Sequence, residues 1–127
     1  MKTAVILLGH GSRIIEANNA IKEIAGLVKE KGNYDLVDVA FLQLAKPLLG
    51  DKIDECVQFG IKKIIIQPYF LHEGRHIVDD IPEEIEKARQ KHPHLEIIFT
   101  RPLGVHSKLA DVVIERITER LNGTARD

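Results

Sequence analysis

The sequence contains little cysteine and no excess of charge of either sign. Cys56 is the only cysteine among 127 residues, so no internal disulfide can form and a secreted disulfide scaffold is excluded. Acidic and basic residues nearly balance, at a formal net charge of -1. The sequence therefore has neither an overall basic field for nucleic acid nor an acidic tail.

Long hydrophobic runs are also lacking. The N-terminal run, residues 4–8, is shorter than the roughly 7–15 apolar residues of a secretory signal. No run approaches the ~20 residues that span a bilayer. The apolar fraction of 44% and the charged fraction of 29% are typical of a globular protein. We therefore expect a cytoplasmic protein with a single domain over residues 1–123 and a disordered tail over residues 124–127.

Two kinds of pattern alternate along the chain. Short continuous apolar runs predict buried strands over residues 3–8, 36–42, 61–68 and 95–100. Apolar residues at helical spacing follow each run and predict four helices. The third helix is expected to begin at Asp80, which forms a capping pair with Glu83 around Pro82. The fourth is expected to be capped by Ser107.

This alternation predicts an α/β fold, a three-layer sandwich with a central parallel four-stranded sheet flanked by helices. In such folds ligands bind outside the carboxyl ends of the strands, where the strand order reverses. If the first and third strands are central neighbours, two loops line that crevice. They are GHGSR at residues 9–13 and PYFLHEGRH at residues 68–76.

The second loop contains HEGRH, which has the letters of the zinc peptidase pattern H-E-x-x-H. That mechanism needs both histidines on one continuous helix. Here His72 and His76 follow a strand end, Gly74 lies between them, and the helix is expected only from Asp80. The sequence therefore argues against a peptidase.

The first loop places His10 between two glycines. It lacks the lysine of a Walker phosphate loop, and no arginine stands just before the histidine as in phosphohistidine phosphatases. Because neighbouring strands lie about 4.8 Å apart, His10 and His76 can face one metal ion across the crevice. Such a pair suits Co²⁺, Ni²⁺, Fe²⁺ or Zn²⁺. His92, His94 and His106 are interpreted as solvated surface histidines, and His72 as either crevice-lining or exposed.

Five segments in this order resemble the small CbiX-type class II chelatases, which insert a divalent metal into sirohydrochlorin. They are residues 8–13, 41–47, 68–76, 80–82 and 101–104. The resemblance implies that His10 and His76 are the catalytic, metal-binding histidines, with His10 also accepting a proton. It implies a homodimer without a permanently bound cofactor. It further implies that the tetrapyrrole contacts the residue before Pro47 and the stretch Leu71, His72, Glu73, Gly74, Arg75 and His76.

One position departs from the family pattern. The residue before Pro47 is commonly glutamate in the family and is Lys46 here. A charged lysine cannot accept a proton, but it can pair with a substrate carboxylate, as can Arg13, Arg75 and Arg101. We prefer the hypothesis that the protein inserts Co²⁺ in cobalamin biosynthesis, a branch of tetrapyrrole (porphyrin) biosynthesis. Ni²⁺ and Fe²⁺ are the alternatives. A non-catalytic metal or tetrapyrrole carrier and a phosphoryl-transfer enzyme using His10 remain competing hypotheses.

Overall fold

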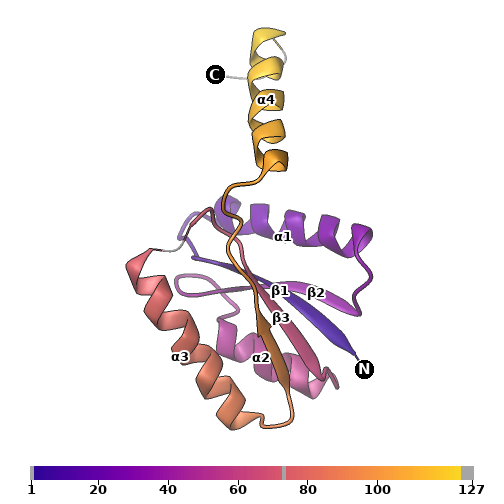
Figure 1. Ribbon diagram of the computed structural model, residues 1–127, viewed down its shortest axis with the longest axis vertical. Coiled ribbons are helices and arrows are strands. Elements are labelled where there is room, and N and C mark those ends of the chain that lie inside the picture. Colours follow the sequence, from indigo (N-terminus) through magenta and orange to yellow (C-terminus); the bar gives the residue numbers. More distant parts are fainter. Residues whose placement is uncertain (1, 73, 124–127) are drawn as a thin grey trace.

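The computed structural model describes residues 2–72 and 74–123, and of residues 75–78 it describes the backbone alone. Strands and helices alternate as the sequence predicts (Figure 1). The order is β1 (Thr3–Gly9), α1 (Ile15–Lys31), β2 (Leu36–Phe41), α2 (Leu49–Gln58), β3 (Lys63–Pro68), α3 (Arg75–Lys91), β4 (Glu96–Phe99) and α4 (Ser107–Leu121).

The four strands form one parallel sheet in the order β2-β1-β3-β4. The expectation that the first and third strands are central neighbours is confirmed, with Leu8 opposite Pro68 in the register. The strand order reverses between them, so the loops after β1 and β3 diverge from neighbouring points at the carboxyl edge of the sheet.

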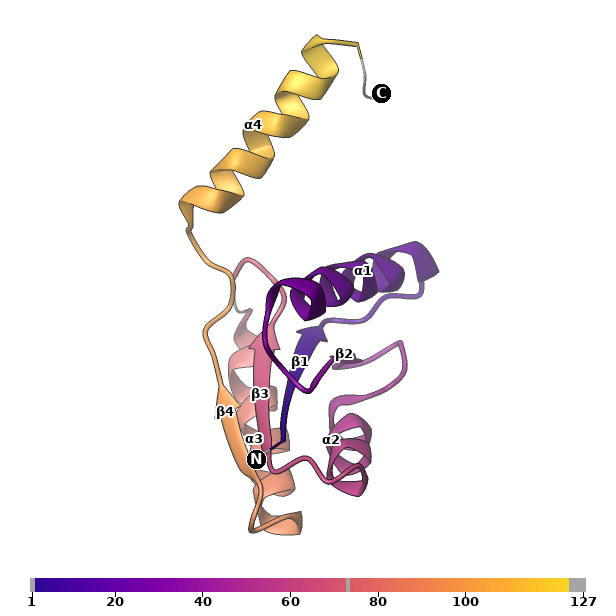
Figure 2. The same ribbon diagram turned by 90° about the vertical axis from the view of Figure 1, so that its right-hand side faces the viewer.

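Helices cover both faces of the sheet, which gives the predicted three layers (Figure 2). Alternate residues of β1 enter opposite cores, because side chains of a strand alternate in direction. Ile6 and Leu8 pack with α2 and α3, including Ile53 and Ile81. On the other face Val5, Leu7, Val39 and Phe41 pack with Ile21 and Ala25 of α1. That second face is covered by α1 alone among these three helices.

The expected start of the third helix at Asp80 is wrong. The helix begins at Arg75, after Gly74 at the N-cap, and Pro82 lies inside it. An internal proline costs a helix about 3 kcal/mol because it removes a hydrogen bond and crowds the preceding turn. Ile81 and Ile85 on either side of it are buried in the core. Their burial, at roughly 1.5–3 kcal/mol for each side chain, outweighs that penalty.

Helix α4 is the exception to the layered arrangement. It extends away from the sheet beyond its carboxyl edge (Figures 1 and 2), and none of its residues is buried. Ser107, the expected cap, is its first residue. The cap is His106, whose Nδ1 accepts a hydrogen bond from the Lys108 backbone N–H at 3.0 Å. A side-chain acceptor placed at this position satisfies a free N–H of the first turn, as a serine would.

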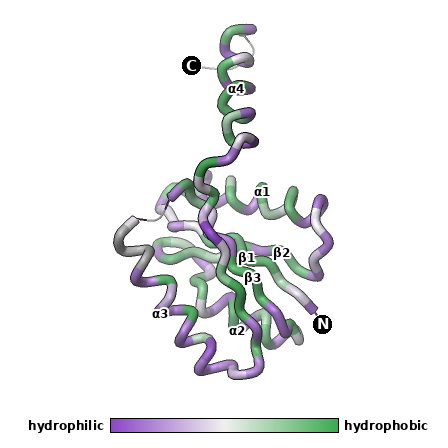
Figure 3. Tube along the Cα trace, viewed as in Figure 1, coloured by the Kyte–Doolittle hydropathy of each residue, from purple (hydrophilic) through white to green (hydrophobic). Residues whose placement is uncertain are grey.

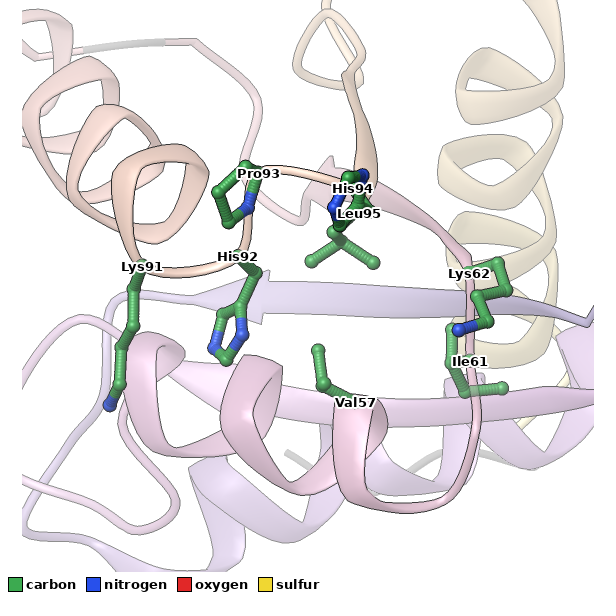
Figure 4. A pocket seen from close by; sticks show the side chains of 8 residues that line it. All are labelled: Val57, Ile61, Lys62, Lys91, His92, Pro93, His94 and Leu95. Carbon is green, nitrogen blue, oxygen red and sulfur yellow. The ribbon is translucent and has the colours of Figure 1, made fainter.

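At the opposite, amino edge of the sheet, charged side chains join α2 to the end of α3. Asp54 accepts hydrogen bonds from Lys91 at 2.7 Å and pairs with His92 at 2.8 Å. His92 is therefore not the solvated histidine expected from the sequence; it ties the end of α3 to α2. A hollow of about 260 Å³ lies here. Figure 4 shows its lining side chains, with His92 and His94 from the α3–β4 connection and Val57 from α2.

No helix within residues 2–72 and 74–123 combines the length and the apolar character that a bilayer crossing requires.

Candidate functional site

The loop after β1 passes close to the loop after β2. Gly11 adopts a φ of +92°, and a Cβ at this position would overlap the carbonyl oxygen of Gln43. The Gln43 N–H donates to the carbonyl of His10 at 3.2 Å, and the Leu42 N–H donates to that of Gly9 at 3.0 Å. Only glycine fits both the backbone angle and the space, so Gly11 fixes the path that the chain takes after His10.

Asn18 holds the same loop against the first turns of α1. Its Oδ1 accepts from the Ser12 N–H at 3.0 Å, and its Nδ2 donates to the Ser12 carbonyl at 2.7 Å. The Ser12 hydroxyl in turn accepts from the Ile14 N–H at 3.0 Å. Ser12 thus shapes the loop. Sequence reasoning missed Asn18, although an asparagine pair early in a helix, where asparagine is a poor helix former, was a signal.

His10 lies exposed at the carboxyl edge, directly after β1. Its imidazole packs against the ring of Phe70, with centroids 4.9 Å apart and planes tilted by 48°. Phe70 belongs to the loop after β3, and the Tyr69 N–H beside it donates to the Leu8 carbonyl at 2.8 Å. The prediction that these two loops meet at one edge is therefore confirmed.

The described residues of this edge line two hollows. One, of about 230 Å³, is lined by Gly9, His10, Gly11, Ser12, Ala17, Asn18, Ala20, Ile21, Phe41 and Tyr69. The other, of about 450 Å³, is lined by Leu71, His72, Arg101, Pro102, Leu103, Gly104 and Val105. His72 therefore lies beside Arg101 and the segment that leads to α4. This wall, formed by residues 102–105, was not predicted as part of the site.

Three predicted site residues fall outside what the structure describes. Glu73 is not described at all, and the side chains of Arg75 and His76 are not described. The backbone places Arg75 and His76 in the first turn of α3, whereas His72 precedes the Gly74 cap. The two histidines of HEGRH thus belong to different elements, which contradicts the peptidase geometry. Pairing of His10 with His76 stays a prediction, and the described side chains form no cluster of three or more metal ligands.

Three basic side chains stand exposed around the edge, each after a different strand. They are Arg13 after β1, Lys46 after β2 and Arg101 after β4. Within the described part of the chain, no carboxylate forms an ion pair with any of them. Lys46 precedes Pro47 through a cis peptide bond, and the Pro47 carbonyl accepts from the Phe41 N–H at 2.8 Å. Cations with no carboxylate partner favour a ligand that carries several negative charges.

Large apolar side chains are exposed at the same edge. Ile14, Ile15, Leu44, Leu71 and Val105 are each more than half exposed, from 54% for Leu44 to 106% for Val105. They belong to the loops after β1, β2, β3 and β4 and to the start of α1. Exposed apolar side chains that gather at one edge, among cations, indicate a binding surface for a flat anionic molecule or another protein.

The sequence model of the CbiX family matches residues 4–120. The chain is 37% identical to sirohydrochlorin ferrochelatase, chloroplastic, from Arabidopsis thaliana, over 97% of this chain and 55% of that protein. It is 33% identical to a sirohydrochlorin cobaltochelatase from Priestia megaterium, over 98% of this chain and 40% of that protein. It thus spans about half the length of these relatives. A sirohydrochlorin cobaltochelatase from Methanopyrus kandleri is 32% identical, over 93% of this chain and 96% of that protein.

Solved structures show the same fold. A putative cobalamin (vitamin B12) biosynthesis CbiX protein from Marinobacter aquaeolei superimposes with a TM-score of 0.80 at 26% identity, over 94% of this chain and 98% of that one. The sirohydrochlorin chelatase SirB from Bacillus subtilis subspecies spizizenii, in complex with cobalt, superimposes with a TM-score of 0.85 at 28% identity. The match covers 94% of this chain and 51% of that one.

Proposed function

The chain belongs to the CbiX family, and on this basis we propose that it catalyses the insertion of a divalent metal ion, Co²⁺, into sirohydrochlorin. The observation that supports the proposal most directly is the position of His10. It is exposed at the carboxyl edge beside Phe70, between loops that also present basic and apolar side chains. Sirohydrochlorin is a flat macrocycle with several carboxylates, and this edge offers complementary chemistry.

In the proposed reaction His10 and His76 bind the incoming ion through neutral imidazoles while it loses water. The ion then replaces the two pyrrole protons at the centre of the macrocycle. An imidazole side chain can accept a proton near neutral pH, so we assign one of these protons to His10, once it has released the ion, and the other to solvent water. Glu73 is the alternative acceptor.

The basic residues position the substrate in this scheme. Arg13, Arg75 and Arg101 pair with carboxylates at the macrocycle's periphery, because a guanidinium donates two parallel hydrogen bonds to one carboxylate. Lys46 supplies a further positive charge after β2. His72 and Leu71, with Gly74 allowing close approach, complete the proposed contact surface on the β3–α3 side.

The choice of Co²⁺ rests on the relatives. The Methanopyrus kandleri protein, which this chain covers almost completely, is named a cobaltochelatase. A Priestia megaterium relative at 36% identity is named a ferrochelatase, so Fe²⁺ is the first alternative and Ni²⁺ the second. Imidazole ligands accept all three ions, and selection among them depends on geometry and metal supply.

We also propose that two copies work together as a homodimer in the cytoplasm. The chain spans 55% of its Arabidopsis thaliana relative and 51% of the Bacillus subtilis structure. A pair of identical chains would match the length of these proteins. The absence of an internal disulfide agrees with a reducing compartment.

The function is tested by mixing purified protein with sirohydrochlorin and Co²⁺, Ni²⁺ or Fe²⁺ in turn, without oxygen, and following the absorbance of the macrocycle. We expect insertion to be fastest with Co²⁺ and well above the rate without protein. His10→Ala should reduce the rate at least about 100-fold, a loss typical of removing a group that acts on the reacting atoms.

His94→Ala is the matched control, because His94 lies at the opposite edge of the sheet. It should retain the full rate. Binding of Co²⁺ and sirohydrochlorin without any acceleration would instead support the non-catalytic carrier. Covalent phosphate on His10 would support phosphoryl transfer.

A further inference from the structure

Helix α4 carries an apolar stripe that stays uncovered by residues 2–72 and 74–123, the part of the chain that the structure describes. Its apolar residues recur at intervals of three and four, which places them on one side of a helix. They are Leu109, Ala110, Val113, Ile114, Ile117 and Leu121. Val113, Ile114, Ile117 and Leu121 are 53–81% exposed. Figure 3 shows hydrophobic and hydrophilic residues alternating along this isolated helix.

One half of the sheet is also left uncovered. On the face that packs with α1, the helix lies against β1 and β2. The residues of β3 and β4 on that face are only partly covered: Ile65 is half-buried at the margin of the α1 cluster, and its register partner Ile98 is 36% exposed. On the opposite face their neighbours Ile64 and Ile97 are buried under α2 and α3. Among the described elements, no helix therefore covers β3 and β4 on this face of the sheet.

The two surfaces match in size. Fifteen helical residues make α4 about 22 Å long at 1.5 Å per residue. The six residues of β3 extend about 20 Å at 3.3 Å per residue. A helix of this length covers the two strands from end to end.

The segment before α4 directs the helix away from its own sheet. The N–H groups of Leu103 and Gly104 donate to the carbonyls of Phe70 and Leu71 at 3.0 and 2.8 Å. This pairing fixes the segment beside the β3–α3 loop, beyond the end of the sheet. Only Val105 and His106 separate it from α4, and His106 is committed to capping the helix.

We propose that α4 is exchanged between two copies of this chain: the apolar stripe of each helix covers Ile65 and Ile98 of the partner's sheet, beside the partner's α1. This deepens the homodimer proposed above by naming the surfaces that join the copies. It also brings the two carboxyl edges face to face, since each α4 leaves its chain at that edge.

The area is consistent with this arrangement. A helix about 22 Å long and 10 Å wide has a footprint of about 220 Å². Each docking buries this area on the helix and again on the sheet, so two symmetrical dockings bury about 900 Å² in all. Specific interfaces need about 1,200 Å². In this arrangement the exposed apolar side chains Ile14, Ile15, Leu44 and Val105 of the edge loops would lie between the exchanged helices and supply the remainder.

Disulfide cross-linking tests the exchange. A chain with Ile98→Cys is mixed with a chain carrying Ile117→Cys on the stripe, allowed to exchange subunits and oxidised. We expect a covalent dimer of the two different chains. The matched control is Glu115→Cys, on the polar side of the same helix, which should give less than about a tenth of that product. Cys56 can stay, because it is buried and burial raises the pKa of its thiol to about 11.

Other outcomes overturn the exchange. A double variant, Ile98→Cys with Ile117→Cys in one chain, that cross-links internally would show that α4 folds back on its own sheet. A dimer in sedimentation that never forms the mixed cross-link would leave the homodimer standing but reject this interface. A monomer at every concentration would reject both, while metal insertion by that monomer would leave the proposed activity intact.

A charge in the stripe provides a second measurement. Ile117→Glu should raise the dimer dissociation constant at least about 100-fold, because a carboxylate would be buried without a partner. Glu115→Gln should leave it unchanged. Retained circular dichroism would show that the Ile117→Glu chain is folded. An unchanged dissociation constant in that folded variant contradicts the proposal.

Discussion

The imidazole of His10 lies against the ring of Phe70, which joins the end of β1 to the end of β3 through two side chains. The contact is tilted, so the aromatic ring limits the rotation of the imidazole without hydrogen bonding to it. Phe70 thus positions the group to which we assign metal binding, although it cannot bind the ion itself.

Phe70→Ala should therefore reduce metal insertion by about 10-fold, through a less restricted imidazole. Phe70→Leu should recover less than half of this loss, since it restores volume but not the flat surface. The rate of macrocycle metallation at saturating Co²⁺ and sirohydrochlorin measures both variants. Equal rates in wild-type and Phe70→Ala proteins would show that the contact only packs the loop.

The two histidines of HEGRH should differ in importance. His76→Ala should nearly abolish insertion, as His10→Ala should, whereas His72→Ala should lower the rate by less than about 10-fold because His72 precedes α3 and lies beside Arg101. Isothermal titration with Co²⁺ in the absence of the tetrapyrrole separates metal binding from substrate binding. A folded His76→Ala protein with full activity would refute the proposed histidine pair.

Gly11→Ala should destabilise the protein by about 2 kcal/mol or more, because the new methyl group meets the Gln43 carbonyl at a backbone angle suited to glycine. Urea unfolding measures the change. Gly26→Ala in α1, where an added Cβ meets no atom within 4 Å, is the control and should be neutral or stabilising. Similar unfolding midpoints for Gly11→Ala and wild type would contradict the tight crossing of the two loops.

Lys46→Glu tests the substitution that departs from the family pattern. If Lys46 pairs with a substrate carboxylate, reversing its charge should raise the KM for sirohydrochlorin about 10-fold, and the difference should shrink as salt is added. Lys62→Glu, at the amino edge, changes the net charge equally and serves as control. An increase in kcat with unchanged KM would instead mean that a carboxylate here accepts protons.

Asp54 should make stability depend on acid pH. Hydrogen bonds from Lys91 and His92 hold the pKa of the Asp54 carboxyl below its ordinary value of 3.8. A lowered pKa in the folded state adds stability above the unfolded pKa, and this stability is lost as the pH falls through the folded value. Asp54→Asn should thus lower the free energy of unfolding by about 0.5–1 kcal/mol at pH 7 and by less at pH 3. Urea titrations at both pH values measure this, and a constant difference would contradict the assignment.

The order of strands and helices was predictable from the sequence, because continuous apolar runs and helical spacing report which faces are buried. The meeting of the GHGSR and PYFLHEGRH loops followed from that order, and the contact between His10 and Phe70 confirms it. The start of α3 was not predictable from capping signals. The core around Ile81 and Ile85 holds a helix through Pro82, and core packing is not a local property of the sequence.

Polar partners distant in sequence were the least predictable features. His92 and Asp54 are 38 positions apart, and only the fold brings them together. Asn18 lies close to Ser12 in sequence, yet its role depends on the path that Gly11 gives the loop. Likewise, the pattern predicted that α4 is amphipathic but not that its stripe lies outside its own chain's core.

The placement of Arg13, Lys46 and Arg101 after three different strands has a consequence for selectivity. In the sheet order β2-β1-β3-β4, the strands that precede Lys46 and Arg13 are neighbours, whereas β3 separates β1 from the strand that precedes Arg101. Neighbouring strands lie about 4.8 Å apart, so the three chain segments leave the sheet at unequal intervals, and the loops then decide where each charge ends. Polyanions with equal charge and different distances between their carboxylates should therefore bind this edge with different affinities. The arrangement of the strands thus contributes to the selection of substrate shape.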